Sequence, residues 1–79
     1  MEIKASDLKR GVEVDSGKYT LLWNKKTNEY NICKYAKPSE IYYRYQRLHD
    51  AVRHLNSLTG WTDVAVDDEG DLPNYWGGN

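Results

Sequence analysis

The chain contains few side chains that bind metals or act as nucleophiles, and their spacing argues against both kinds of chemistry. His49 and His54 are five residues apart, so on a helix they lie about 140° apart and cannot meet at one metal ion. Asp50 shares a helix face with His54, but no further ligand completes a site. Cys33 has no histidine near it in sequence to act as its base. We therefore predict no metal site, no cofactor and no enzyme activity, and interpret Cys33 as structural.

Tyrosine and basic side chains are interleaved near the middle of the chain, which is typical of a contact surface. Tyr42, Arg44 and Arg47 lie close together in sequence, and Lys25 and Lys26 fall in a turn-like segment. Tyrosine and arginine are enriched at the energetic centres of protein interfaces, and they also stack on bases and neutralise phosphates. We predict these five residues as binding residues, although an ordinary solvent-facing sheet has a similar composition.

The C-terminal segment is acidic and contains two further aromatic candidates. Residues 1–53 contain all eleven Lys and Arg and seven acids, whereas residues 54–79 contain five acids and no Lys or Arg. The first part therefore has a net charge of +4 and the second of −5. Several interpretations stay open for residues 67–79: a solvated tail, mimicry of nucleic-acid charge, coverage of the chain's own basic body, or docking to a partner. In the last case Tyr75 and Trp76 are the binding residues.

The elements that must position these residues follow from a change of hydrophobic period. Ile41, Tyr43 and Tyr45 alternate, as on one face of a strand. Immediately afterwards, apolar residues recur at spacings of three and four, as on one stripe of a helix: Leu48, Ala51, Val52, Leu55 and Leu58. The pattern predicts a strand followed by an amphipathic helix over 47–59, with Gly60 as its C-terminal exit. Leu55, at the centre of the stripe, is predicted to be in the core.

Shorter alternating segments predict the rest of a sheet. After one helical turn within 1–11, the alternation predicts three strands, at 12–14, 19–23 and 29–35. Proline at position 38 interrupts the pattern, so the fourth strand is expected to begin near Glu40. Residues 61–66 alternate weakly and are compatible with an added edge strand. The predicted fold is α+β: a small antiparallel four-stranded sheet, β-β-β-β-α, with the helix on one face, comprising residues 1–66 and an acidic tail at 67–79.

Two stretches resemble known families in outline. Residues 6–19, SDLKRGVEVDSGKY, resemble the opening of SH3-like β-barrel domains of translation factors, but the long helix replaces the closing strands of that family. Residues 19–58 are similar in topology to the three-strand-plus-helix DNA-binding domains of some phage-type integrases, and this resemblance implies a sheet that contacts DNA. Small size, tyrosine richness and an acidic end also resemble phage-encoded inhibitors such as anti-CRISPR proteins, a likeness that transfers no residues.

Length and composition limit the function further. A chain of 79 residues forms one domain and buries only about 60% of its unfolded surface. No stretch reaches the roughly 20 apolar residues of a membrane helix, and one cysteine permits no intrachain disulfide. We therefore expect a cytoplasmic protein without membrane contact. The leading interpretation is a non-enzymatic protein-binding module, an inhibitor or adaptor of a larger complex with a protein partner. The alternative is a nucleic-acid-binding domain using the Tyr/Arg sheet surface.

Overall fold

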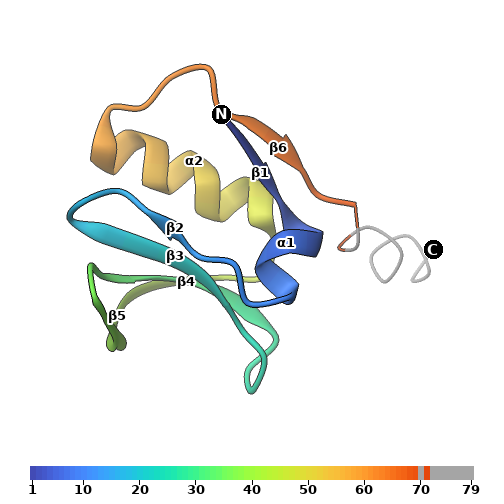
Figure 1. Ribbon diagram of the computed structural model, residues 1–79, viewed down its shortest axis with the longest axis vertical. Coiled ribbons are helices and arrows are strands. Elements are labelled where there is room, and N and C mark those ends of the chain that lie inside the picture. The colour runs from blue at the N-terminus through green and yellow to red at the C-terminus, as the bar shows by residue number, and fades with distance from the viewer. Residues whose placement is uncertain (70, 72–79) are drawn as a thin grey trace.

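The computed structural model describes residues 1–69 and 71. Its elements are β1 (Glu2–Lys4), α1 (Ala5–Lys9), β2 (Val14–Asp15), β3 (Tyr19–Asn24), β4 (Glu29–Lys34), β5 (Lys37–Tyr45), α2 (Leu48–Thr59) and β6 (Ala65–Asp67). Strands β2-β3-β4-β5 form an antiparallel sheet in that order, and β1 and β6 form a separate parallel pair. The long helix α2 lies across one face of the four-stranded sheet (Figure 1). The predicted α+β class with a four-stranded antiparallel sheet is confirmed.

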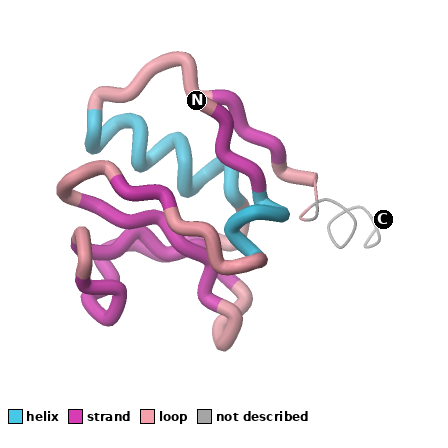
Figure 2. The backbone as a smooth tube through the Cα atoms, viewed as in Figure 1, coloured by secondary structure: helices cyan, strands magenta, loops and turns pink. Residues whose placement is uncertain are grey.

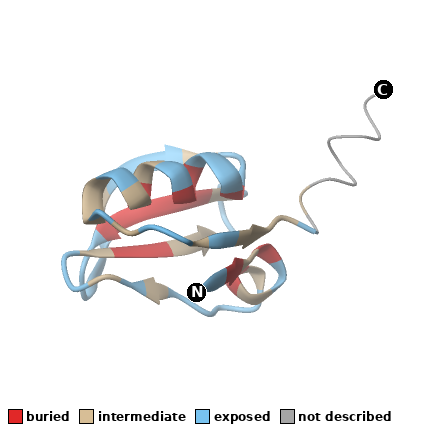
Figure 3. Ribbon diagram, turned by 90° about the horizontal axis from the view of Figure 1, so that it is seen from above, coloured by how far each residue is buried: buried red, intermediate tan, exposed pale blue. Residues whose placement is uncertain are grey.

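The core lies between α2 and the sheet because the helical stripe and the strand alternation meet there. Leu48, Ala51, Val52 and Leu55 are the buried residues of α2, and they pack in one cluster with Leu21, Tyr30 and Ile32 of the sheet and with Ile3, Ala5 and Leu8 of β1 and α1. Figure 3 shows the buried part of α2 on the side that faces the strands. Leu55 has no exposed surface, which confirms the core prediction.

The helix ends where its sequence predicts. Gly60 adopts a left-handed conformation with φ +78°, and its N–H donates to the Asn56 carbonyl at 2.8 Å. Only glycine takes this conformation without a steric penalty from Cβ. Trp61, directly after the helix, then packs against the core cluster.

The parallel pair β1–β6 joins two distant parts of the sequence and was not predicted. Ile3 is paired with Val66, and the Ala65 N–H donates to the Met1 carbonyl at 2.9 Å. Figure 2 shows the two strands side by side, apart from the main sheet. Of the weakly alternating residues 61–66, only 65 and 66 lie in a strand, β6, and this strand pairs with β1 rather than with the edge of the four-stranded sheet.

Strand β5 departs from the predicted boundaries. It begins at Lys37 rather than near Glu40 and includes Pro38. Because β5 is an edge strand, the N–H that proline lacks costs no hydrogen bond on the open side. The two-residue turn before β5 contains Ala36 at φ +62°. The predicted strand at 12–14 is also shifted, since β2 comprises only Val14 and Asp15.

Candidate binding surface

A shallow groove of about 540 Å³ lies where the start of β3 and the later part of β5 meet the β4–β5 turn. It is lined by Gly17, Lys18, Tyr19, Lys34, Tyr35, Tyr42 and Tyr43. We call this set the tyrosine groove. It contains four of the seven tyrosines of the chain and two lysines, and none of the described residues that line it is acidic.

The sheet register explains why these rings gather. Tyr19 of β3 is paired with Lys34 of β4, directly before the turn residue Tyr35. In β5 the register slips: Ile32 is paired with Tyr43, but Cys33 is paired with Ile41. This β-bulge leaves Tyr42 as an extra residue and turns its side chain away from the regular alternation. The bulge therefore brings Tyr42 beside Tyr19.

The rings in the groove contact one another edge to face. The ring centroids of Tyr19 and Tyr42 are 6.0 Å apart with an interplanar angle of 77°, and those of Tyr42 and Tyr43 are 6.5 Å apart at 61°. Tyr43 also lies 4.1 Å from the imidazole of His54 on α2. These contacts orient the rings without covering them: Tyr35, Tyr42 and Tyr43 are 46%, 43% and 39% exposed. Tyr43 thus contacts α2 through His54 and stays partly exposed.

Charged side chains lie around the rings of the groove. Lys18 and Lys34 lie at its rim, and the Tyr42 hydroxyl donates a hydrogen bond to Glu40 Oε2 at 3.0 Å. This hydrogen bond raises the pKa of Tyr42 above its usual value, so the phenol stays neutral near pH 7. The groove thus presents neutral aromatic rings with Lys18 and Lys34 beside them and the Glu40 carboxylate at the Tyr42 hydroxyl.

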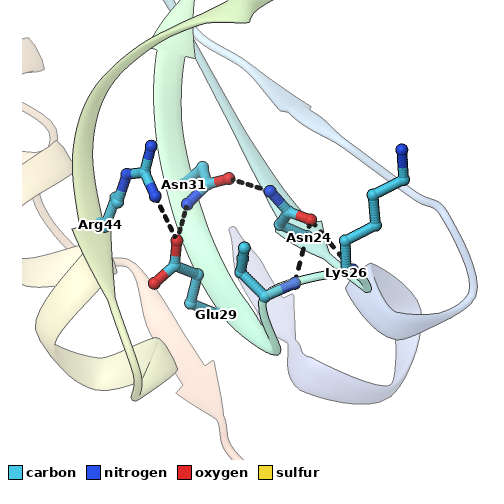
Figure 4. Close-up of polar contacts among 6 residues, drawn as sticks. Asn24, Lys26, Glu29, Asn31 and Arg44 are labelled. Carbon is cyan, nitrogen blue, oxygen red and sulfur yellow. Dashed lines mark hydrogen bonds and ion pairs between the residues drawn. The ribbon is translucent and has the colours of Figure 1, made fainter.

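The structure separates the residues predicted from sequence. Tyr42 lies in the tyrosine groove, but Arg44 lies on the sheet face opposite α2 and pairs with Glu29 at 3.3 Å. Figure 4 shows Arg44 in a polar chain that continues through Asn31 to Asn24, whose Oδ1 accepts the Lys26 N–H at 3.0 Å. Lys25 and Lys26 lie in the β3–β4 turn, at the end of the hairpin away from Tyr19. Tyr75 and Trp76 lie outside the described residues.

The sequence analysis predicted only Tyr42 among the groove residues and missed six: Gly17, Lys18, Tyr19, Lys34, Tyr35 and Tyr43. Four of these six form the Lys-Tyr pairs 18–19 and 34–35, one at the start of a strand and one at the end of the next. Aligning the two predicted strands as a hairpin would have placed these pairs side by side. The displacement of Tyr42 by the bulge has no comparable signal in the sequence.

A second cavity, of about 560 Å³, lies at the other end of β3 and contains Arg47. It is lined by Lys9, Trp23, Thr27, Asn28, Tyr30, Gln46, Arg47, His49, Asp50, Arg53, Asp68 and Asp71. We call it the charged cavity. Two acids of the C-terminal segment are bound there: Asp68 pairs with His49 at 3.1 Å, and Asp71 pairs with Lys9 at 3.1 Å. These contacts agree with the interpretation that the acidic segment covers part of the basic body.

Within residues 1–69 and 71, no three His, Cys, Asp or Glu side chains converge as metal ligands would. Cys33 is fully buried, and burial raises the pKa of its thiol. Neither α1 nor α2 has the length and apolar character that a membrane crossing requires.

Comparison of the chain with protein-family models, with curated proteins and with solved structures gave no match.

Proposed function

We propose that this chain is a protein-binding module without catalytic activity, acting as an inhibitor or adaptor of a larger complex, and that the tyrosine groove is its contact surface. The observation that carries the proposal is the gathering of Tyr35, Tyr42 and Tyr43, all substantially exposed, in one groove with two lysines. An exposed cluster of large rings on a small domain marks an interaction site.

The composition of the groove indicates the kind of partner. A tyrosine ring has only two side-chain torsions to fix and a large apolar area to bury, so it contributes strongly when a partner covers it. Lys18 and Lys34 favour carboxylates at the rim and repel basic partners. The groove therefore suits a protein segment that combines an apolar side chain with neighbouring Asp or Glu residues.

The chemistry of Cys33 supports a role without catalysis. A nucleophilic cysteine requires an accessible thiolate. Cys33 has no exposed surface, and its raised pKa keeps the thiol protonated near pH 7.

Single-stranded nucleic acid is the second candidate partner, supported by the same rings and lysines. Bases stack on exposed tyrosines, and lysines neutralise the neighbouring phosphates. The separation of Tyr42 from Arg44 weighs against the larger Tyr/Arg surface originally expected for nucleic acid. Arg44 faces the opposite side of the sheet and is paired with Glu29.

Selection from a random peptide library displayed on phage tests the leading proposal. We expect wild-type protein to enrich peptides that contain an aromatic or aliphatic residue beside Asp or Glu. Their affinity should fall at least about tenfold in Tyr42→Ala and in the double variant Lys18→Glu, Lys34→Glu, because one lost anchor or reversed charge removes 1.4 kcal/mol or more.

Arg44→Ala is the matched control, because it removes a large exposed side chain from the opposite face of the sheet. Peptide binding that is unaffected by Tyr42→Ala but lost in Arg44→Ala would contradict the proposed surface.

Binding of a fluorescently labelled mixed-sequence oligonucleotide tests the second candidate partner, nucleic acid. Micromolar binding that weakens steeply with salt and is lost in Tyr42→Ala would favour nucleic acid over protein.

A further inference from the structure

The carboxylate of Asp71 is held by three donors from three separate elements. The Tyr30 hydroxyl of β4 donates to Oδ1 at 2.6 Å, and the Leu48 N–H at the start of α2 donates to Oδ2 at 3.2 Å. The Lys9 ammonium at the end of α1 lies 3.1 Å from Oδ1. The Asp71 side chain is only 11% exposed. Asp71 thus occupies the position of a bound anion.

The donors would be left poorly satisfied without an anion. With Asp71 in place Tyr30 is 1% exposed; its ring packs in the core, and its hydroxyl donates to Asp71 within the charged cavity. Arg47, the residue preceding α2, makes no side-chain cap, and the Leu48 N–H depends on Asp71 instead. A buried donor that loses its acceptor is destabilising. The three groups therefore form a receptor for an oxyanion whichever molecule supplies it.

The surrounding cavity is larger and more basic than one carboxylate requires. It has about 560 Å³ of space with Asp71 in place, a volume typical of ligand sites. Its lining includes Lys9, Arg47 and Arg53 as permanent cations, opposed by Asp50, Asp68 and Asp71. Displacement of the segment containing Asp68 and Asp71 would leave Asp50 as the only acid among the described lining residues. The same cavity would then have a clear positive charge.

We propose that the charged cavity is a phosphate-binding site that Asp71 fills in the absence of ligand, so that a phosphate-bearing ligand binds in competition with the chain's own C-terminal segment. A phosphate group offers more acceptor oxygens and more charge than a carboxylate, and it suits a site with an ammonium, a hydroxyl, a backbone N–H and nearby guanidinium groups. Trp23, over whose ring Lys9 lies at 5.5 Å, forms an apolar wall beside this position.

The site is independent of the tyrosine groove. The groove lies at the start of β3, around Tyr19, whereas the charged cavity contains Trp23 near the end of the same strand. A ligand in the cavity would release the segment that follows β6 without touching the groove. A negative result for the charged cavity therefore leaves the proposal for the tyrosine groove unaffected, and the reverse also holds.

Calorimetric titration of the 79-residue chain with inorganic pyrophosphate tests the competition. Asp71→Asn removes the competing charge while keeping the size of the side chain. We expect this variant to bind pyrophosphate at least about tenfold more tightly than wild type, because the apparent affinity of a self-occupied site is reduced by the fraction of molecules in which it is open. Succinate provides the carboxylate comparison and should bind more weakly.

Glu69→Gln is the matched control. It removes the same charge two residues away, from an exposed side chain outside the cavity lining. We expect its affinity for pyrophosphate to stay at the wild-type value, and we expect Lys9→Gln in the Asp71→Asn background to abolish the gain. Three outcomes would overturn the proposal. Wild type and Asp71→Asn could bind pyrophosphate with equal affinity, or Glu69→Gln could gain as much affinity as Asp71→Asn. The third outcome is that the double variant Lys9→Gln, Asp71→Asn keeps the affinity of Asp71→Asn.

A second measurement covers the case in which Asp71→Asn does not fold. The amide resonance of Leu48 in the wild-type chain reports directly on the acceptor at its N–H. Titration with pyrophosphate to millimolar concentration should shift this resonance in a saturable manner. A Leu48 resonance that stays fixed while distant surface amides move would overturn the proposal.

Discussion

Asn31 shows how the sheet can be polar on one face without losing stability. It is fully buried, yet its amide accepts from Asn24 Nδ2 at 3.0 Å and donates to Glu29 Oε1 at 3.4 Å. Arg44 is the last member of this hydrogen-bond network and pairs with the same Glu29 oxygen. Because each buried polar atom has a partner, the network does not carry the large cost of an unsatisfied amide. The face away from α2 is thus held by hydrogen bonds, whereas the opposite face is held by apolar packing.

At the residue scale, Leu55→Ala tests the apolar face. Leu55 has no exposed surface and packs in the core cluster with Leu21. We expect its truncation to lower the free energy of unfolding by about 2–5 kcal/mol, through lost burial and the cavity left behind. Urea unfolding measures the change. Ser57→Ala, at an exposed position of the same helix, should be nearly neutral. An unchanged midpoint for Leu55→Ala would contradict the helix-on-sheet core.

Cys33 provides a second test at this scale. Its thiol is fully buried, and burial, followed by the charge of Glu13, raises its pKa. Only the thiolate reacts with alkylating reagents, so we expect slow labelling of the native protein near pH 8 and rapid labelling in urea. Mass spectrometry after timed quenching measures both rates. Equal rates in the two conditions would show that the strand around Cys33 is open to solvent.

At the scale of elements, Gly60 determines where α2 ends. Its φ of +78° lies in the left-handed region, and a Cβ built there would meet no atom within 4 Å. The cost of a side chain is therefore conformational rather than a clash. We expect Gly60→Ala to destabilise the protein by about 1–2 kcal/mol. Gly60→Asn should cost less, because asparagine tolerates this conformation. Thermal unfolding of both variants provides the measurement, and equal losses would refute the conformational explanation.

At the scale of the whole molecule, the tyrosine at position 30 links the sheet to the C-terminal segment. Burial, and then the hydrogen bond to Asp71, raise its pKa well above the usual value of 10.0. Below pH 10 the folded and unfolded chains both keep this proton, and the contribution of Tyr30 to stability is complete. Above pH 10 the unfolded chain loses the proton while the folded chain keeps it, so the free energy of unfolding falls as the pH rises.

Replacement of this tyrosine isolates its contribution. Tyr30→Phe has no proton to lose, so we expect its stability to decline less steeply than that of wild type above about pH 10. Urea unfolding across this pH range measures the slope. Tyr35→Phe removes an exposed phenol and should retain the wild-type slope. Identical slopes for Tyr30→Phe and wild type would show that another group controls the alkaline transition.

The sequence by itself determined the elements whose hydrophobic period is unambiguous. The change from alternation to a three-and-four spacing after Tyr45 predicted α2 and its buried face, and Gly60 predicted its end. The two central strands and their hairpin followed from alternation and turn chemistry. These features depend on residues close together in sequence, so local spacing contains the necessary information. Tyr42 was also predicted as a binding residue from its neighbours, and this stays a prediction.

Only the tertiary structure decided which distant residues meet. The β1–β6 pair joins segments more than sixty positions apart. The hydrophobic pattern of a three-residue strand is too short to predict which distant strand pairs with it. Pro38 fits in β5 because that strand happens to lie at the edge of the sheet. The bulge brings Tyr42 to Tyr19 and separates it from Arg44, and folding of the chain end brings Asp71 to Tyr30. Register and long-range packing set these positions, because they depend on the balance of contacts across the whole fold rather than on local periodicity.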